Sequence, residues 1–192
     1  MPNNATSPHK NFGFLTVSDA PDQGLIGGYL VLNPVGRPLE FHCTAPVRPN
    51  RAQEILYGPT LRPYLYGEQI GRALLERAGT PPALVFTDVE PALAVRDVVP
   101  VPVVFVIPDE KPPAESGPML RLDSAHAGPP HACWPRLHHF AVGSQQLGVT
   151  QIHREDEQVV FDLWQAGAEA FDLAEPFGRI REAIEEARRT AR

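Results

Sequence analysis

Arg48, Asn50 and Arg51 stand close together at a point where the chain could hold an anion. Asn50, with Gln53 three residues later, fits the capping box that begins a helix. The free amides and positive end of such a helix, flanked by two guanidiniums, favour a negatively charged ligand. The simpler alternative is that Arg51 pairs with Glu54 in solvent. Arg48, Asn50 and Arg51 are therefore candidates for anion binding.

A second polar group follows the apolar run ALVFTDV, residues 83–89. If this run is a strand of a parallel sheet, Asp88 and Glu90 lie at its carboxyl end, where open α/β sheets bind ligands. Two carboxylates so close suit acid–base chemistry or a metal ion. Loop solvation and helix capping are the simpler roles. Asp88 and Glu90 are the candidates for a metal-assisted hydrolase, which can draw its nucleophile from water.

Histidines gather later in the chain, within residues 126–139. Imidazole and thiolate at this density are zinc ligands, but no paired CxxC accompanies them. His139 points away from its neighbour if the two lie in a strand. We expect no cofactor, and keep zinc as a lesser alternative at His126, His131, Cys133 and His138.

The adjacent His42 and Cys43 lie in a predicted hairpin formed by residues 28–33 and 37–44. The turn Asn33-Pro34-Val35-Gly36 has the residue preferences of a type I turn, with a glycine that can close the hairpin. Pairing the ends of this turn predicts the register of the two strands. The apolar face would then hold Tyr29, Val31, Leu39, Phe41 and Cys43.

This hairpin separates His42 from Cys43, because neighbouring strand residues point to opposite faces. His42 therefore cannot act as the base for the Cys43 thiol. We expect Cys43 to be buried and inert, and His42 to be a half-exposed strand histidine rather than a catalytic base.

The elements that must position these residues alternate between strand and helix. After the hairpin we predict helices over 51–57 and 60–79, a strand at 83–89, a short helix at 90–98 and a strand at 100–107. Strand, helix and strand in succession indicate a parallel βαβ step. The fold class is α/β, with α+β as the alternative, arranged as a three-layer sandwich with an N-terminal hairpin, two helices and this βαβ step.

Proline divides the chain. Nine of the 22 prolines lie between Pro100 and Pro135, and proline lacks the amide donor that helices and central strands use. We predict a flexible N-terminus at 1–11, an α/β core at 12–107 and a proline-rich loop or linker at 108–136. A hairpin around Gly143-Ser144 and helices follow at 137–192 and pack on the core.

The order hairpin, helix, strand, short helix, strand resembles the core of zinc-dependent cytidine-deaminase-like proteins. Glu54 and Pro91 match positions of that family's motifs. The positions of its zinc ligands are empty here, since Ala92 stands where a cysteine would be needed. The resemblance implies a scaffold without deaminase chemistry.

Composition limits the function classes. The net charge of −6 disfavours nucleic acid as a partner, and no apolar run reaches the ~20 residues of a membrane span. The N-terminus lacks the features of a signal peptide, so we expect a cytoplasmic protein. Because catalytic motifs are absent, the sequence favours a non-catalytic module that binds a partner protein or a small anionic ligand, with metal-assisted hydrolysis as the alternative. The amphipathic C-terminal helix offers a surface for a second copy.

Overall fold

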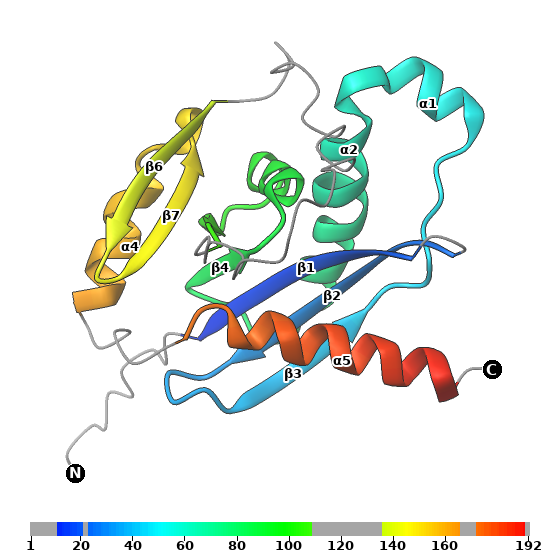
Figure 1. Ribbon diagram of the computed structural model, residues 1–192. Helices are drawn as coiled ribbons and strands as arrows, with labels where there is room; N and C mark the ends of the chain where they lie inside the picture. Colours follow the sequence, from blue (N-terminus) through cyan, green and yellow to red (C-terminus); the bar gives the residue numbers. More distant parts are fainter. Residues whose placement is uncertain (1–10, 21–22, 109–135, 166–171, 191–192) are drawn as a thin grey trace, which may run out of the picture.

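The computed structural model describes residues 11–20, 23–108, 136–165 and 172–190. Seven strands form one mixed sheet in the order β3-β2-β1-β4-β5-β7-β6 (Figure 1). The strands are β1 Phe12–Ala20, β2 Gly24–Leu32, β3 Pro38–Cys43, β4 Leu84–Thr87, β5 Val103–Val106, β6 Leu137–Val142 and β7 Gln145–Thr150. The helical segments are α1 Arg51–Tyr57, η1 Gly58–Thr60, α2 Leu61–Pro63, η2 Tyr64–Gly71, α3 Arg72–Arg77, η3 Glu90–Asp97, η5 Gln151–His153, α4 Asp156–Gln165 and α5 Glu175–Thr190.

The centre of the sheet is a meander joined to a parallel step. β1, β2 and β3 pair antiparallel, while β4 pairs parallel to β1 and β5 pairs parallel to β4. The β6–β7 hairpin completes the sheet beyond β5. The predicted α/β class and the parallel step between β4 and β5 are confirmed.

β1 is the strand that the sequence analysis did not predict. It pairs with β2 along nine positions and with β4 along four, so it lies in the middle of the sheet. The first residues of β1 are buried one after another, so the side chains on both faces of the strand are covered by protein. A strand of this kind shows no alternation of polar and apolar residues that would reveal it.

The predicted hairpin is present, but its predicted register is wrong. The turn forms as expected, since the Asn33 amide donates to the Arg37 carbonyl (3.0 Å) and Gly36 has a φ of 80°. Leu39 is an extra residue in β3, which shifts every later pair by one position. Tyr29 therefore lies opposite His42 rather than Phe41.

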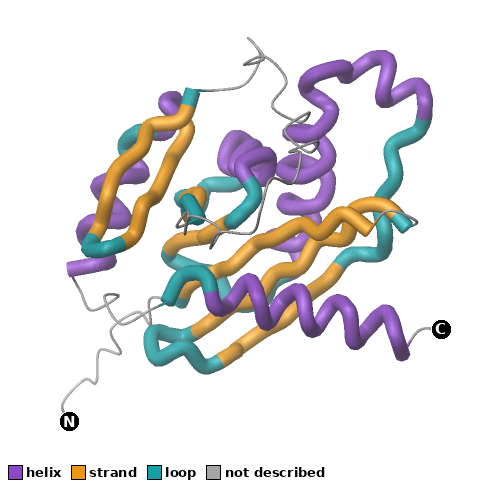
Figure 2. The backbone as a smooth tube through the Cα atoms, in the orientation of Figure 1, coloured by secondary structure: helices purple, strands orange, loops and turns teal. Residues whose placement is uncertain are grey.

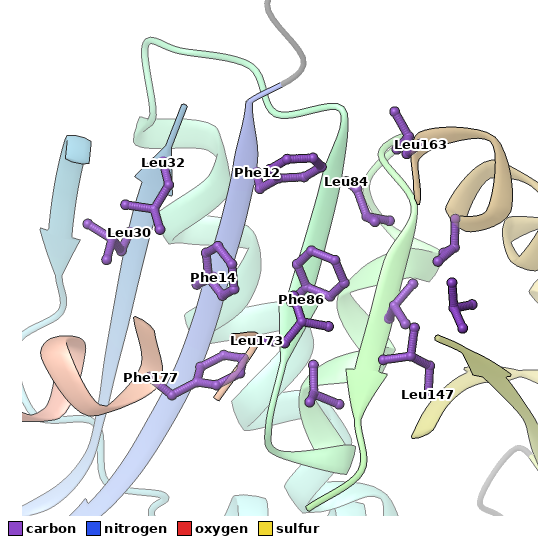
Figure 3. Packing of buried hydrophobic residues seen from close by; sticks show 14 of the residues in the cluster. Phe12, Phe14, Leu30, Leu32, Leu84, Phe86, Leu147, Leu163, Leu173 and Phe177 are labelled. Atoms are coloured by element: carbon purple, nitrogen blue, oxygen red, sulfur yellow. The ribbon is translucent and has the colours of Figure 1, made fainter. Parts of the chain in front are cut away.

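Helices cover both faces of the sheet, and Figure 2 shows helical segments on the two sides of the strands. On one face α4 and α5 pack on phenylalanines and leucines of the strands (Figure 3). On the other face η2, α3 and η3 pack on a second cluster. This arrangement is compatible with the predicted three-layer sandwich. The two clusters include Phe14, Phe86, Phe177 and Ile180 on the α5 face, and Leu15, Tyr29, Ile70 and Leu93 on the opposite face.

The helical stretch after β3 follows the sequence closely at its start. Asn50 caps α1, and Gln53 returns the capping-box hydrogen bond to the Asn50 amide (3.0 Å). Further on, η2 is a π-helix in which Gly67 lies directly against the backbone of η3. A side chain at Gly67 would collide with that backbone, so this glycine allows the two segments to pack.

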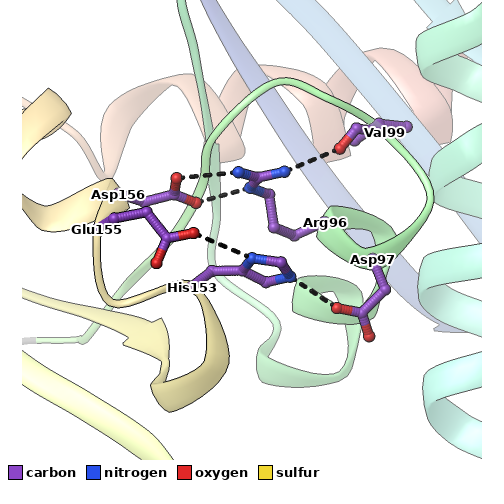
Figure 4. Close-up of polar contacts among 6 residues, drawn as sticks. All are labelled: Arg96, Asp97, Val99, His153, Glu155 and Asp156. Atoms are coloured by element: carbon purple, nitrogen blue, oxygen red, sulfur yellow. Dashed lines mark hydrogen bonds and ion pairs between the residues drawn. The ribbon is translucent and has the colours of Figure 1, made fainter.

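The C-terminal half attaches to η3 through a buried ion pair. Arg96 donates to both carboxylate oxygens of Asp156 (2.7 and 3.1 Å) and to the carbonyl of Val99 (3.1 Å), as Figure 4 shows. Beside it, His153 contacts Asp97 (2.8 Å) and Glu155 (3.6 Å). The contacts of Arg96 with Asp156 and of His153 with Asp97 join residues more than fifty positions apart.

The C-terminal helix docks on its own chain. Phe177, Ile180 and Ile184 of α5 are buried against the α5 face of the sheet. Because these side chains are buried within the same chain, the apolar face of α5 is not exposed to a second copy, contrary to the prediction. Within the described residues, no helix has the length and apolar character that a membrane span needs.

Candidate functional site

Asp88 lies at the point in the sheet where a ligand site is most expected. It follows β4 directly, and β4 neighbours β1 although the two are far apart in sequence. Open α/β sheets bind ligands outside the carboxyl ends of their strands, where the chain order changes direction. Asp88 is a candidate from the sequence on this ground, and the structure places it at the end of β4.

Arg181 of α5 pairs with one carboxylate oxygen of Asp88. The Asp88 side chain is 14% exposed and that of Arg181 is 48% exposed, so the pair sits where the covered sheet opens to solvent. A guanidinium has five N–H donors, and within the described residues Arg181 uses only its Nη2 nitrogen, for Asp88. The pair therefore combines a carboxylate with a partly open anion-binding group.

Thr16 of β1 adds a buried hydroxyl on the same face. Leu15 of β1 pairs with Thr87 of β4. Thr16 and Asp88 are the residues that follow this pair in the two neighbouring segments of the sheet. Thr16 Oγ1 and the second carboxylate oxygen of Asp88 are buried and have no hydrogen-bond partner among the described residues. A buried polar atom without a partner costs about 1–3 kcal/mol, so each of these two atoms calls for an explanation beyond a purely structural role. We call Thr16, Asp88 and Arg181 the strand-end site.

Two further arginines lie along the same edge. Arg48 donates to the carbonyl of Gln23 (2.8 Å), and Arg188 donates to the side-chain oxygen of the same residue (3.1 Å). Gln23 follows β1, and Arg188 lies two turns beyond Arg181 on α5, about 10 Å along the helix axis. Arg48, Arg181 and Arg188 thus form a row of guanidiniums beside the strand-end site, which we call the arginine row.

The predicted anion site at Arg48, Asn50 and Arg51 is not assembled as proposed. Arg51 pairs with Glu54 (2.9 Å), which is the simpler alternative considered above. The Asn50 side chain accepts from the Gln53 amide (2.9 Å), so it serves as a helix cap. Of the three candidates, Arg48 alone belongs to the arginine row, through its contact with Gln23.

Glu90 begins η3 and is separated from Asp88 by Val89, which packs in the cluster of the opposite face. Among the described residues, no three histidine, cysteine, aspartate or glutamate side chains come together as a metal site. His138 contacts Glu157 (2.8 Å). The zinc candidates His126, His131 and Cys133 lie outside the described residues.

Cys43 was expected to be buried, and this is wrong. His42 was expected to be half-exposed on its strand, and the structure places it so. Cys43 is exposed because β3 is an edge strand, and α5 covers β1 and β2 instead. His42 is half-buried on the opposite face and contacts Glu40 (3.1 Å). The two side chains point apart, as predicted.

Sequence reasoning missed Thr16, Arg181 and Arg188. Arg181 lies 93 residues from Asp88, and no local pattern links them. The sequence does show Arg181 next to Ile180, at the border of the apolar face of the C-terminal helix. It becomes informative only when the residue that follows β4 is known to lie beside that helix.

No protein-family model and no curated protein sequence matches this chain. Among solved structures it is similar to human ENDOV, with 13% identity and a TM-score of 0.42, over 96% of this chain and 88% of that chain. It is also similar to Ciona intestinalis endonuclease V in complex with a 23mer DNA containing an inosine followed by a ribo-adenosine. That match has 14% identity and a TM-score of 0.35 over half of this chain, and it spans 45% of the Ciona protein.

These similarities concern the path of the chain and assign no site residue. They do correct two predictions from the sequence. The chain was expected to be a non-catalytic module for a partner protein or a small anion, with nucleic acid disfavoured. One of the two solved structures is named an endonuclease V and holds DNA, which points against both expectations, and neither is proposed again.

Proposed function

We propose that this protein is a hydrolase that cleaves a nucleic-acid phosphodiester at the strand-end site. One observation carries the proposal. Asp88 pairs with Arg181 through one oxygen, while its other oxygen and the Thr16 hydroxyl are buried without partners at the carboxyl edge of β1 and β4. Polar groups held in this way cluster at functional sites, because a purely structural role would leave them satisfied.

The arginine row supports a polymeric substrate. Guanidiniums bind phosphate oxygens through paired hydrogen bonds, and contacts to successive phosphates position a nucleic-acid strand without reading its bases. Arg48, Arg181 and Arg188 lie along one edge rather than around one point. An extended backbone fits this spacing better than a single anion does.

Asp88 is the group that performs the acid–base step. The Asp88 carboxylate takes a proton from a water molecule at its solvent-facing side, and the oxygen of that water then attacks the phosphorus. The phosphorus–oxygen bond to the leaving sugar oxygen breaks, and that oxygen takes a proton from solvent. The products are a phosphate monoester and a hydroxyl end.

Arg181 and Thr16 have supporting roles in this step. Arg181 stabilises the negative charge that develops on the phosphate oxygens, because it is fixed in place by its contact with Asp88. The Thr16 hydroxyl, buried on the neighbouring strand, helps to fix the position of the Asp88 carboxylate.

Oligonucleotide cleavage tests the proposal. Single-stranded and duplex DNA and RNA are incubated with the protein in buffer containing Mg²⁺, Mn²⁺ or a chelator. Both ionic conditions are needed, because Mg²⁺ is often held by one carboxylate together with substrate phosphates. We expect cleavage by the wild type, a loss of at least about 100-fold in rate for Asp88→Asn, and no change for Asp162→Asn on α4. Absence of cleavage by the wild type on every substrate would overturn the assignment.

A further inference from the structure

A cavity of about 620 Å³ lies at the opposite edge of the sheet from the strand-end site. It is bounded by the end of α3, the segment before β4 and the segment before β5, so it adjoins the amino ends of these strands. Its volume lies within the range of small-molecule sites, which is roughly 300–1,000 Å³. Nothing in the proposed hydrolysis uses it.

The walls of this cavity are rigid. Pro81, Pro82, Pro100 and Pro102 all line it, and the proline ring fixes the backbone φ. The adjoining segment is held by Glu40 of β3, which accepts from the Gly79 amide (2.9 Å) and from the Thr80 hydroxyl. A cavity preformed in this way loses little conformational entropy when a ligand binds.

The polar groups at the cavity accept hydrogen bonds and offer few donors. Its four prolines have no N–H group, and the Gly79 amide is already bound to Glu40. The Thr80 hydroxyl gives its hydrogen to Glu40, so only its lone pairs remain for a ligand. Glu76 supplies the single charged side chain of the lining; one of its oxygens accepts from Arg72 (2.6 Å), and the other is left for a ligand.

The surrounding apolar surface favours a flat ring. Proline and valine side chains from two segments make up half of the lining residues, and they offer apolar surfaces without competing polar atoms. A ligand that matches this cavity therefore has an apolar ring and carries hydrogen-bond donors and a positive or neutral charge. A carboxylate or phosphate would meet acceptors and Glu76.

We propose that this cavity, which we call the proline cavity, is a binding site for a small aromatic molecule that carries an amine or amidine group. The ring lies between the proline walls, and the cationic donors face Thr80 and Glu76. The site is separate from the strand-end site and does not depend on the proposed hydrolysis.

Benzamidine and benzoate test this inference, because they share a ring and shape and differ in charge and hydrogen-bonding role. Binding of each to the full-length protein is followed by two-dimensional NMR of the amide signals. Benzamidine should give saturable shifts at residues 76–80, at Ala83 and at Val99 and Val101, with a dissociation constant on the order of 1 mM. Benzoate should give shifts at least about tenfold weaker at the same concentration.

Two variants make the test specific to the cavity. Ala78→Phe places a ring inside the cavity and should abolish the benzamidine shifts, whereas Ala73→Phe, on the exposed side of α3, should preserve them. Glu76→Gln removes the rim charge and should weaken benzamidine by about 3–10-fold without altering the fold. Its exposed position keeps the test decisive if Ala78→Phe unfolds.

Three results would overturn the proposal. One is an absence of saturable benzamidine shifts in the wild type. Another is equal binding of benzoate, which would show that charge and donors do not select the ligand. The third is unchanged benzamidine binding by Glu76→Gln together with shifts that lie outside the cavity.

Discussion

Glu40 illustrates how one carboxylate can organise an edge of this molecule. It accepts hydrogen bonds from the Thr80 hydroxyl, from His42 (3.1 Å) and from the Gly79 amide (2.9 Å). These contacts, led by that of Thr80, lower the pKa of Glu40 below its ordinary value. The charged form is therefore favoured in the folded protein.

The sign of the resulting pH dependence follows from linkage. A carboxylate with a lowered pKa in the folded state contributes stability above its unfolded pKa and loses it as the pH falls through the folded value. Glu40→Gln should thus lower the free energy of unfolding at pH 7, and the difference from wild type should shrink as the pH falls below about 4.5. Urea unfolding at pH 7 and at pH 3 measures this. A difference that stays constant between the two would refute the role given to the carboxylate.

Cys43 provides a second test at the residue scale. Because its side chain is exposed on the edge strand, we expect it to react with iodoacetamide in the folded protein without denaturant. Mass spectrometry of the peptide that contains Cys43 reads the modification, and Cys43→Ser is the control. Protection until the protein is unfolded would mean that another surface covers β3.

At the scale of the elements, α5 completes one face of the sheet. Its buried stripe packs on β1 and β2, and Gly28 of β2 leaves the space that Ile180 and Ile184 fill. A helix packed on a glycine approaches the sheet closely, which also brings Arg181 to Asp88. The packing of this helix and the geometry of the strand-end site are thus linked.

Truncation of this stripe should be costly. Ile184→Ala removes a fully packed side chain and should lower the free energy of unfolding by about 2–5 kcal/mol. Ala187→Ser, on an exposed position of the same helix, should change it by less than about 0.5 kcal/mol. Chemical denaturation compares the two. Equal effects of the two substitutions would show that α5 does not dock as described.

The elements differ in how far their own sequence predicts them. The first turn, the capping box of α1 and the stripe of α5 depend on neighbouring residues, and all three form as predicted. The bulge at Leu39 and the central position of β1 depend on pairing with distant segments, and both were missed. Asp88 could be named from the end of its strand, whereas Thr16 and Arg181 acquire meaning only from the packing that brings them beside it.

At the scale of the whole molecule, the Arg96–Asp156 pair joins the first hundred residues to the C-terminal half. Asp156 is almost fully buried, and both of its oxygens are bound by Arg96. Burial of a carboxylate is tolerated here because the guanidinium lies against it, and its contact with Asp156 raises the pKa of Arg96. This pair connects η3 to the first residue of α4.

Breaking one side of the pair should be worse than replacing both. Arg96→Met leaves the Asp156 charge buried and should cost about 3–5 kcal/mol of unfolding free energy. The double substitution Arg96→Met with Asp156→Leu should recover most of this loss, because no unpaired charge remains. Thermal unfolding of the single and double variants forms the test. A double variant that is as unstable as the sum of both single variants would contradict it.

The central claim for the whole molecule is that Asp88 performs chemistry on a nucleic-acid backbone held along one edge of the sheet. The most direct measurement is a single-turnover cleavage rate with labelled oligonucleotide and excess protein, together with the dissociation constant, for the wild type and Asp88→Asn. We predict cleavage by the wild type, a rate at least about 100-fold lower for Asp88→Asn, and binding within about threefold of the wild type. Cleavage by Asp88→Asn at the wild-type rate, or no cleavage by either protein despite binding, would contradict the claim.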